Sequence, residues 1–141
     1  MSVGEICSRE VVTAERSTSV RDAAYLMRSR HTGSVVVVEG EGEQLTPLGI
    51  VTDRDIVVDV IAKDVPVEGL TVGDIMGSEL LTARESDGIW ETILRMRAMG
   101  VRRLPVVDNE THYLVGILAM DDLISFLGGE SVLLLQLLIY A

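Results

Sequence analysis

Gly49-Ile50-Val51-Thr52-Asp53-Arg54-Asp55 links an apolar strand to a helix through a Thr-x-x-Asp step. Thr52 and Asp55 lie at the expected helix start, where unpaired backbone N–H groups and the helix dipole favour bound anions. One interpretation is a ligand site, with phosphate at the helix start and a ribose on the Asp55 carboxylate. The other is a helix cap, because Thr52 as N-cap with Asp55 three residues later approximates a capping box.

An internal repeat extends outward from this step. Its two copies are offset by 69 residues up to the polar loop at 40–43, and by 67 residues after it. A unit of about 65 residues is marginal alone, so we expect each copy to cover the other's apolar face. The matching segments are Val3-Gly4-Glu5-Ile6 with Val72-Gly73-Asp74-Ile75, Thr13-Ala14 with Thr82-Ala83, Val37-Val38 with Val106-Val107, Gly49-Ile50-Val51 with Gly116-Ile117-Leu118, and Asp55 with Asp122.

Each copy is predicted to have the same order of elements. A capped turn at Ser2-x-x-Glu5 or Thr71-x-x-Asp74 precedes an extended piece, an amphipathic helix, two strands and a closing helix. The predicted extended pieces are 10–13 and 79–82, the helices start near Val20 and Ile89, the strands are 35–38, 48–51, 104–107 and 114–118, and the closing helices carry Ile56, Val57, Val60 and Ile61 or Leu123, Ile124 and Leu127. Residues 63–70 form the predicted linker.

The composition excludes several kinds of partner. A net charge of −10 and a pI near 4.5 oppose binding to nucleic acid or to an anionic membrane. Cys7 is the only cysteine, which excludes an intrachain disulfide and favours a reducing, cytoplasmic setting. The N-terminus has no pattern of a secretory signal. The apolar tail at 129–141 is shorter than the roughly 20 residues that span a bilayer, so it is expected to be a helix that packs on a partner.

The repeat and two of its phrases resemble the cystathionine-beta-synthase (CBS) domain pair, or Bateman module. The phrases are Gly49-Ile50-Val51-Thr52-Asp53-Arg54-Asp55 and Val101-Arg102-Arg103-Leu104-Pro105-Val106-Val107-Asp108. The resemblance implies an α/β fold of tandem β-α-β-β-α repeats, packed sheet to sheet with pseudo-two-fold symmetry. Repeat 1 would cover residues 1–65 and repeat 2 residues 66–128, followed by the tail at 129–141. It also implies two clefts that bind AMP, ADP, ATP or S-adenosylmethionine as a regulatory ligand, with no covalent cofactor.

The first implied cleft combines residues of both copies. By the resemblance, Thr52 and Asp55 would face the strand start at Val101, Arg102 and Arg103. Asp55 would accept the ribose hydroxyls, and the arginines would bind phosphate through charge-assisted hydrogen bonds. Ile50, Leu80, Leu81 and Val101 would line an apolar slot for adenine. The alternative for the arginines is a solvated pair or ion pairs with some of the chain's 22 acidic residues.

The second implied cleft is expected to be weaker. It would use Asp122 and Ile117 with Val11, Val12, Thr32 and Gly33. Ala119 replaces the threonine of the first copy, and Gly33 and Ser34 stand at the positions equivalent to Arg102 and Arg103. These positions supply no cation, so a nucleoside would fit here better than a phosphorylated ligand.

Three classes of function remain from the sequence. The first is an adenosine-ligand sensor that modulates an unknown partner protein, expected to be a homodimer. The second is an interaction module that dimerises without ligand. The third is an enzyme acting on nucleotides, which is disfavoured because no nucleophile, base or metal site is visible: His31 and His112 lack a metal-binding spacing.

Overall fold

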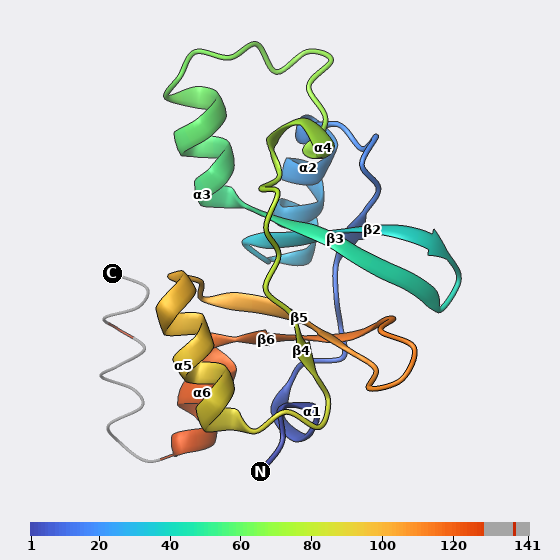
Figure 1. Cartoon of the computed structure of the whole chain (residues 1–141). Helices are drawn as coiled ribbons and strands as arrows, with labels where there is room; N and C mark the ends of the chain where they lie inside the picture. Colours follow the sequence, from blue (N-terminus) through green and yellow to red (C-terminus); the bar gives the residue numbers. More distant parts are fainter. Residues whose placement is uncertain (129–136, 138–141) are drawn as a thin grey trace. The chain divides into compact units, whose positions relative to one another are not determined.

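The computed structural model describes residues 1–128 and Leu137 (Figure 1). The chain forms two compact units. The first unit is Val11–Leu80, and the second unit joins Met1–Glu10 to the chain from Leu81 onward. The apolar tail predicted at 129–141 lies outside the described residues, apart from Leu137.

The first unit is built on a three-stranded sheet in the order β1-β2-β3. Its β1 pairs parallel with β2, and β2 pairs antiparallel with β3. The parallel pair is joined by a helical crossover, as such pairs require. The elements in chain order are β1 (Thr13–Ala14), α2 (Val20–Arg30), β2 (Ser34–Glu41), β3 (Gln44–Thr52), α3 (Asp53–Asp55), the π-helix η1 (Ile56–Ile61) and α4 (Val72–Ile75).

The second unit repeats this plan with a sheet in the order β4-β5-β6. Both sheets have an irregularity at the same point of the hairpin, after Val37 in β2 and after Val106 in β5. The elements are α1 (Val3–Ile6), β4 (Ala83–Arg84), α5 (Ile89–Met99), β5 (Arg103–Val107), β6 (Leu114–Ala119) and α6 (Met120–Leu127). The mixed α/β class predicted from the sequence is confirmed.

The cores are aliphatic, as the composition indicates. Val35, Val36 and Val37 of β2 are fully buried, and so are Leu104 and Val106 of β5. A continuous β-branched run has no solvent-facing side, which is why these strands are central in their sheets. Each unit has its own apolar cluster, which sits on one sheet and its helices.

The leading turn of each repeat packs on the sheet of the other repeat. The α1 backbone is tied to the chain beside β4 by hydrogen bonds from Val3 N–H to Asp87 C=O and from Gly4 N–H to Glu85 C=O, both 2.9 Å. In the first unit, Val72 and Gly73 of α4 donate in the same way to Thr18 and Arg16, at 2.8 and 3.0 Å. The compact units therefore differ from a division of the chain at residue 65.

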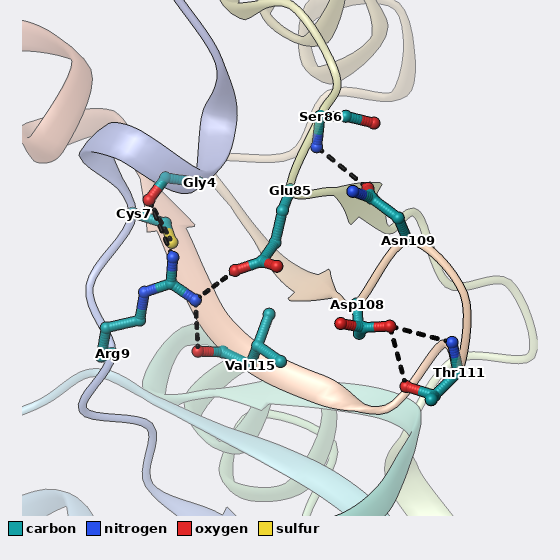
Figure 2. A network of polar contacts seen from close by, with 9 residues as sticks. All are labelled: Gly4, Cys7, Arg9, Glu85, Ser86, Asp108, Asn109, Thr111 and Val115. Carbon is teal, nitrogen blue, oxygen red and sulfur yellow. Dashed lines mark hydrogen bonds and ion pairs between the residues drawn. The ribbon is translucent and has the colours of Figure 1, made fainter.

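Arg9 reinforces the attachment of the N-terminal segment (Figure 2). Its guanidinium donates to the Gly4 carbonyl at 2.9 Å, and it forms an ion pair with the Glu85 carboxylate. Ser8 and Ile117 exchange two backbone hydrogen bonds of 2.9 Å beside it. Burial raises the pKa of the neighbouring Cys7 thiol against the opposing charge of Arg9, so the thiol stays protonated at neutral pH.

The structure corrects the sequence prediction at two kinds of element. The extended pieces at 10–13 and 79–82 are mostly not strand, because the ladder begins only at Thr13 and Ala83. The closing helix of the first copy is a π-helix, with Ala62 N–H bonded to Val57 C=O at 2.9 Å. Its wider turn buries Val60 but leaves the side chains of Val57 and Ile61 more than half exposed.

Among the described helices, none is long and apolar enough to span a membrane.

Candidate functional site

The Thr52–Asp55 step forms a complete capping box. The Asp55 N–H donates to Thr52 Oγ1 at 3.1 Å, and the Thr52 N–H donates to Asp55 Oδ2 at 2.9 Å. The cap interpretation is therefore correct, and both side chains are half-buried. The box uses one carboxylate oxygen and the lone pairs of the hydroxyl. Asp55 Oδ1 and the Thr52 hydroxyl proton take no part in it, so a box of this kind also suits a ligand.

The start of β2 lies beside this step in the same unit. Ser34 pairs with Thr52 across the hairpin, and Asp53 N–H donates to Gly33 C=O at 2.9 Å. A Cβ on Gly33 would come within 2.9 Å of the Asp53 carboxylate. Glycine is required here because the Asp53 side chain already occupies that space.

The equivalent step of the second unit has only half of the box. Ala119 N–H donates to Asp122 Oδ2 at 3.1 Å, but alanine has no hydroxyl to accept a hydrogen bond in return. Desolvation raises the pKa of the half-buried Asp122, partly opposed by the hydrogen bond from Ala119. The charge of Asp121 adds to the rise, and that of Arg103 opposes it.

The arginine pair lies next to Asp122 within the second unit. Arg103 pairs with Ala119, and Met120 N–H donates to Arg102 C=O at 2.9 Å. The sequence analysis assigned no cation to the Asp122 side, and in this respect it missed Arg103. The signal was the hairpin register: when two antiparallel strands are joined by a turn, the residue that opens the first lies beside the residue that closes the second.

The remaining predicted site residues are distributed over both units. Leu81 and Val101 pack against the apolar cluster of the second unit, and Val12 packs against that of the first. Packing in a core is therefore part of their role. Half-buried side chains are found at all seven of the other predicted lining positions: Val11, Thr32, Gly33, Ile50, Leu80, Val101 and Ile117.

Metal chemistry has no support among the described residues, where no three His, Cys, Asp or Glu side chains are grouped to hold an ion. Within the first unit, the geometry at Thr52–Asp55 offers a carboxylate acceptor, a hydroxyl and a helix start. This set can bind hydroxyl groups and an anion without bond cleavage.

Comparison with known proteins identifies the family. A model of the CBS domain matches residues 3–61 and 72–129, which is most of the chain. The chain therefore belongs to the family of CBS domain proteins, and the matched segments form a CBS domain pair. The family resemblance predicted from the sequence is confirmed.

Two relatives and one solved structure illustrate the similarity. The uncharacterized protein MK0525 of Methanopyrus kandleri is 36% identical over 124 residues, which are 88% of this chain and 61% of that protein. The CBS domain-containing protein YhcV of Bacillus subtilis is 32% identical over 132 residues, 92% of this chain and 89% of its own length. The CBS domain pair of protein MJ0100, in complex with 5′-methylthioadenosine and S-adenosyl-L-methionine, matches with a TM-score of 0.79 and 25% identity, covering 91% of this chain and all of that one.

Proposed function

We propose that this chain is a regulatory module that binds an adenosine-containing ligand and modulates a partner protein. The observation that carries the proposal is the capped Thr52–Asp55 step in a CBS domain pair. A related pair, that of MJ0100, binds two adenosine derivatives. The proposed ligand is AMP, ADP, ATP or S-adenosylmethionine.

Each part of the ligand has a proposed contact. Asp55 Oδ1 accepts from the ribose hydroxyls, because Oδ2 is already engaged in the box. The Thr52 hydroxyl and the N–H groups of the helix start donate to phosphate. Ile50, Leu80, Leu81 and Val101 line the adenine slot, and Arg102 and Arg103 provide the positive charge that phosphate binding requires.

The Asp55 side is proposed as the stronger of the two sites. At the Asp122 side a hydroxyl is absent, and the raised pKa of Asp122 shows that its ionised form is costly in its surroundings. Arg103 partly offsets that cost, so a phosphorylated ligand is not excluded there by charge. Val11, Val12, Thr32, Gly33 and Ile117 are the proposed lining of this weaker site.

A thermal-shift panel of AMP, ADP, ATP, S-adenosylmethionine and adenosine tests the function. A ligand that binds only the folded state stabilises it by about 2.7 kcal/mol at a hundredfold excess over Kd. We expect Asp55→Ala to remove most of the shift and Asp122→Ala, its repeat-equivalent control, to remove little. Arg102→Ala with Arg103→Ala should weaken phosphorylated ligands but not adenosine. A loss confined to Asp122→Ala would reverse the assignment of the sites.

The second candidate is an interaction module that acts without ligand. Large apolar side chains are exposed on the helices of the second unit: Trp90 is 71% exposed, Leu94 61% and Phe126 41%. Apolar faces of this kind are typical of association surfaces. We propose that two copies associate as a homodimer, which sedimentation would show as twice the chain mass. Binding none of the panel while remaining dimeric would favour this candidate.

A further inference from the structure

A polar pocket of about 380 Å³ lies within the second unit, away from the Ala119–Asp122 step in the sequence. Its volume is at the lower end of the range for ligand pockets, so it suits a small molecule. Charged groups of both signs line it. They come from β4 and the turn after it, from α5, and from the loop before β6: Arg84, Asp87, Glu91, Arg95 and His112, together with Thr82.

The walls of the pocket are held by their own hydrogen bonds. Arg95 Nη2 donates to Thr82 C=O at 2.7 Å, and Arg95 Nη1 lies 3.4 Å from Asp87 Oδ2. Asp87 also accepts from the Arg84 N–H at 2.9 Å. The Asp87 side chain is only 19% exposed, so it positions both arginines rather than facing solvent.

The loop that carries His112 is tied down as well (Figure 2). Asp108 accepts from the Thr111 N–H and hydroxyl at 2.9 and 3.2 Å, and these bonds hold the pKa of the Asp108 carboxyl below its ordinary value. Ser86 N–H donates to Asn109 Oδ1 at 3.0 Å, which joins this loop to the turn after β4. Both sides of the pocket are therefore ordered before any ligand arrives.

Two charged groups in the pocket retain unused capacity. Arg84 meets Asp87 through Nε at 3.6 Å, and in the described chain no hydrogen bond engages its two terminal nitrogens. Glu91 lies one helical turn before Arg95, yet Arg95 pairs with Asp87 instead. Among the described ion pairs, none includes Glu91, whose carboxyl folds back over Gly88.

The other repeat shows that the fold does not require this set. At the offset of 69 residues, Arg84 corresponds to Glu15, Asp87 to Thr18 and Arg95 to Leu26. Both repeats form the same sheet and the same 11-residue helix. The charges therefore belong to the second repeat alone and call for an explanation other than folding.

We propose that this pocket binds a small zwitterion of the α-amino acid class. The carboxylate of the ligand accepts two hydrogen bonds from the fork of Arg84, the geometry in which guanidinium groups bind carboxylates most strongly. The ammonium group of the ligand pairs with Glu91. A simple anion is disfavoured because Asp87 and Glu91 balance the two arginines, and a simple cation is disfavoured for the converse reason.

The test is a titration of the ¹⁵N-labelled full chain with the protein amino acids one at a time, followed by NMR. We expect one or more to shift the amides of Thr82 and Gly88, whereas acetate and methylammonium, which carry the two charges separately, do not. Arg84→Gln and Glu91→Gln should each weaken binding about tenfold, which corresponds to about 1.4 kcal/mol. Arg97→Gln is the matched control on α5, since Arg97 does not line the pocket, and it should leave binding unchanged.

Three results would overturn the proposal: no shift with any amino acid, equal shifts with acetate, or equal weakening by Arg97→Gln. The variants alter exposed side chains, so their folds are expected to persist, and unchanged spectra outside the pocket verify this. The proposal is independent of adenosine binding, and the AMP thermal shift should be the same in Arg84→Gln and the wild-type chain.

Discussion

At the scale of single residues, two glycines are required because a sulfur-containing side chain lies against each. A Cβ on Gly49 would come within 2.9 Å of Met76 Sδ, and a Cβ on Gly116 within 2.8 Å of Cys7 Sγ. Cys7 and Met76 are repeat-equivalent, as are the two glycines. In each unit, then, the residue after the leading turn packs on the strand that ends at the Asp55 or Asp122 step.

The two glycines should differ in their tolerance of a methyl group. At Gly116 the new Cβ would also lie 2.8 Å from the Ser8 carbonyl, which is backbone and is held by Ile117. We expect Gly116→Ala to lower the free energy of unfolding by about 1–3 kcal/mol, the usual cost of overpacking. Gly49→Ala should cost less, because the thioether of Met76 can rotate away. Urea denaturation compares them, and equal losses would contradict the explanation.

The charge of Asp122 should oppose folding at neutral pH. Its pKa is raised in the folded state, chiefly by desolvation, so the folded chain binds this proton more tightly than the unfolded chain does. We expect Asp122→Asn, which keeps an acceptor for the Ala119 N–H, to melt at a higher temperature at pH 7. The advantage should shrink as the pH falls through the raised pKa towards the ordinary value of 3.8. A difference in melting temperature that is constant with pH would show that the carboxyl charge is not its cause.

At the scale of elements, the helix starts show how similar backbones are capped to different extents. Thr52 and Thr71 each complete a capping box, whereas α6 starts at Ala119 with one of the two hydrogen bonds. The N-cap conformation is the same, since Ala119 has φ −120° and ψ 157° and Thr52 has φ −110° and ψ 162°. The backbone at Ala119 is therefore already suited to a capping side chain.

Ala119→Thr should supply the missing cap. Its hydroxyl would accept from the Asp122 N–H, as Thr52 accepts from Asp55, and we expect the second unit to gain about 1 kcal/mol. Ala119→Val, which has the same shape without the hydroxyl, is the control and should gain less. Thermal denaturation of both variants measures the effect, which is absent if the two variants melt together.

At the scale of the whole molecule, each repeat contributes its leading turn to the other compact unit. Val3 of α1 and Val72 of α4 are fully buried, but Val3 belongs to the apolar cluster with Leu104 and Val72 to the cluster with Val35. The two units therefore depend on chain segments that are far apart in the sequence.

This exchange predicts opposite effects for two equivalent substitutions. Val3→Ala should destabilise the second unit and Val72→Ala the first, each by about 2 kcal/mol for lost burial and the cavity left behind. Hydrogen exchange localises the effect: amides of β5 and β6 should exchange faster in Val3→Ala, and those of β2 and β3 in Val72→Ala. Faster exchange in the repeat that carries the substitution would contradict the exchange of leading turns.

Local features were readable from the sequence because neighbouring residues determine them. The β-branched runs around Val36 and Val106 indicated central strands, the Thr71-x-x-Asp74 spacing indicated a cap, and the constant offset of the repeat indicated two equivalent sheets. The family phrases around Asp55 and Arg103 then identified a CBS domain pair, and with it a candidate site at Thr52 and Asp55.

Features that depend on distant parts of the chain required the tertiary structure. The side-chain pattern of 56–61 fits an α-helix as well as a π-helix over so short a length, so hydrogen bonding alone distinguishes them. The strand register brought Arg103 beside Asp122, and the folding of the chain ends placed α1 on the second sheet. The polar pocket around Arg84 and Glu91 also joins segments that the sequence separates, because only packing brings β4, α5 and the loop at His112 together.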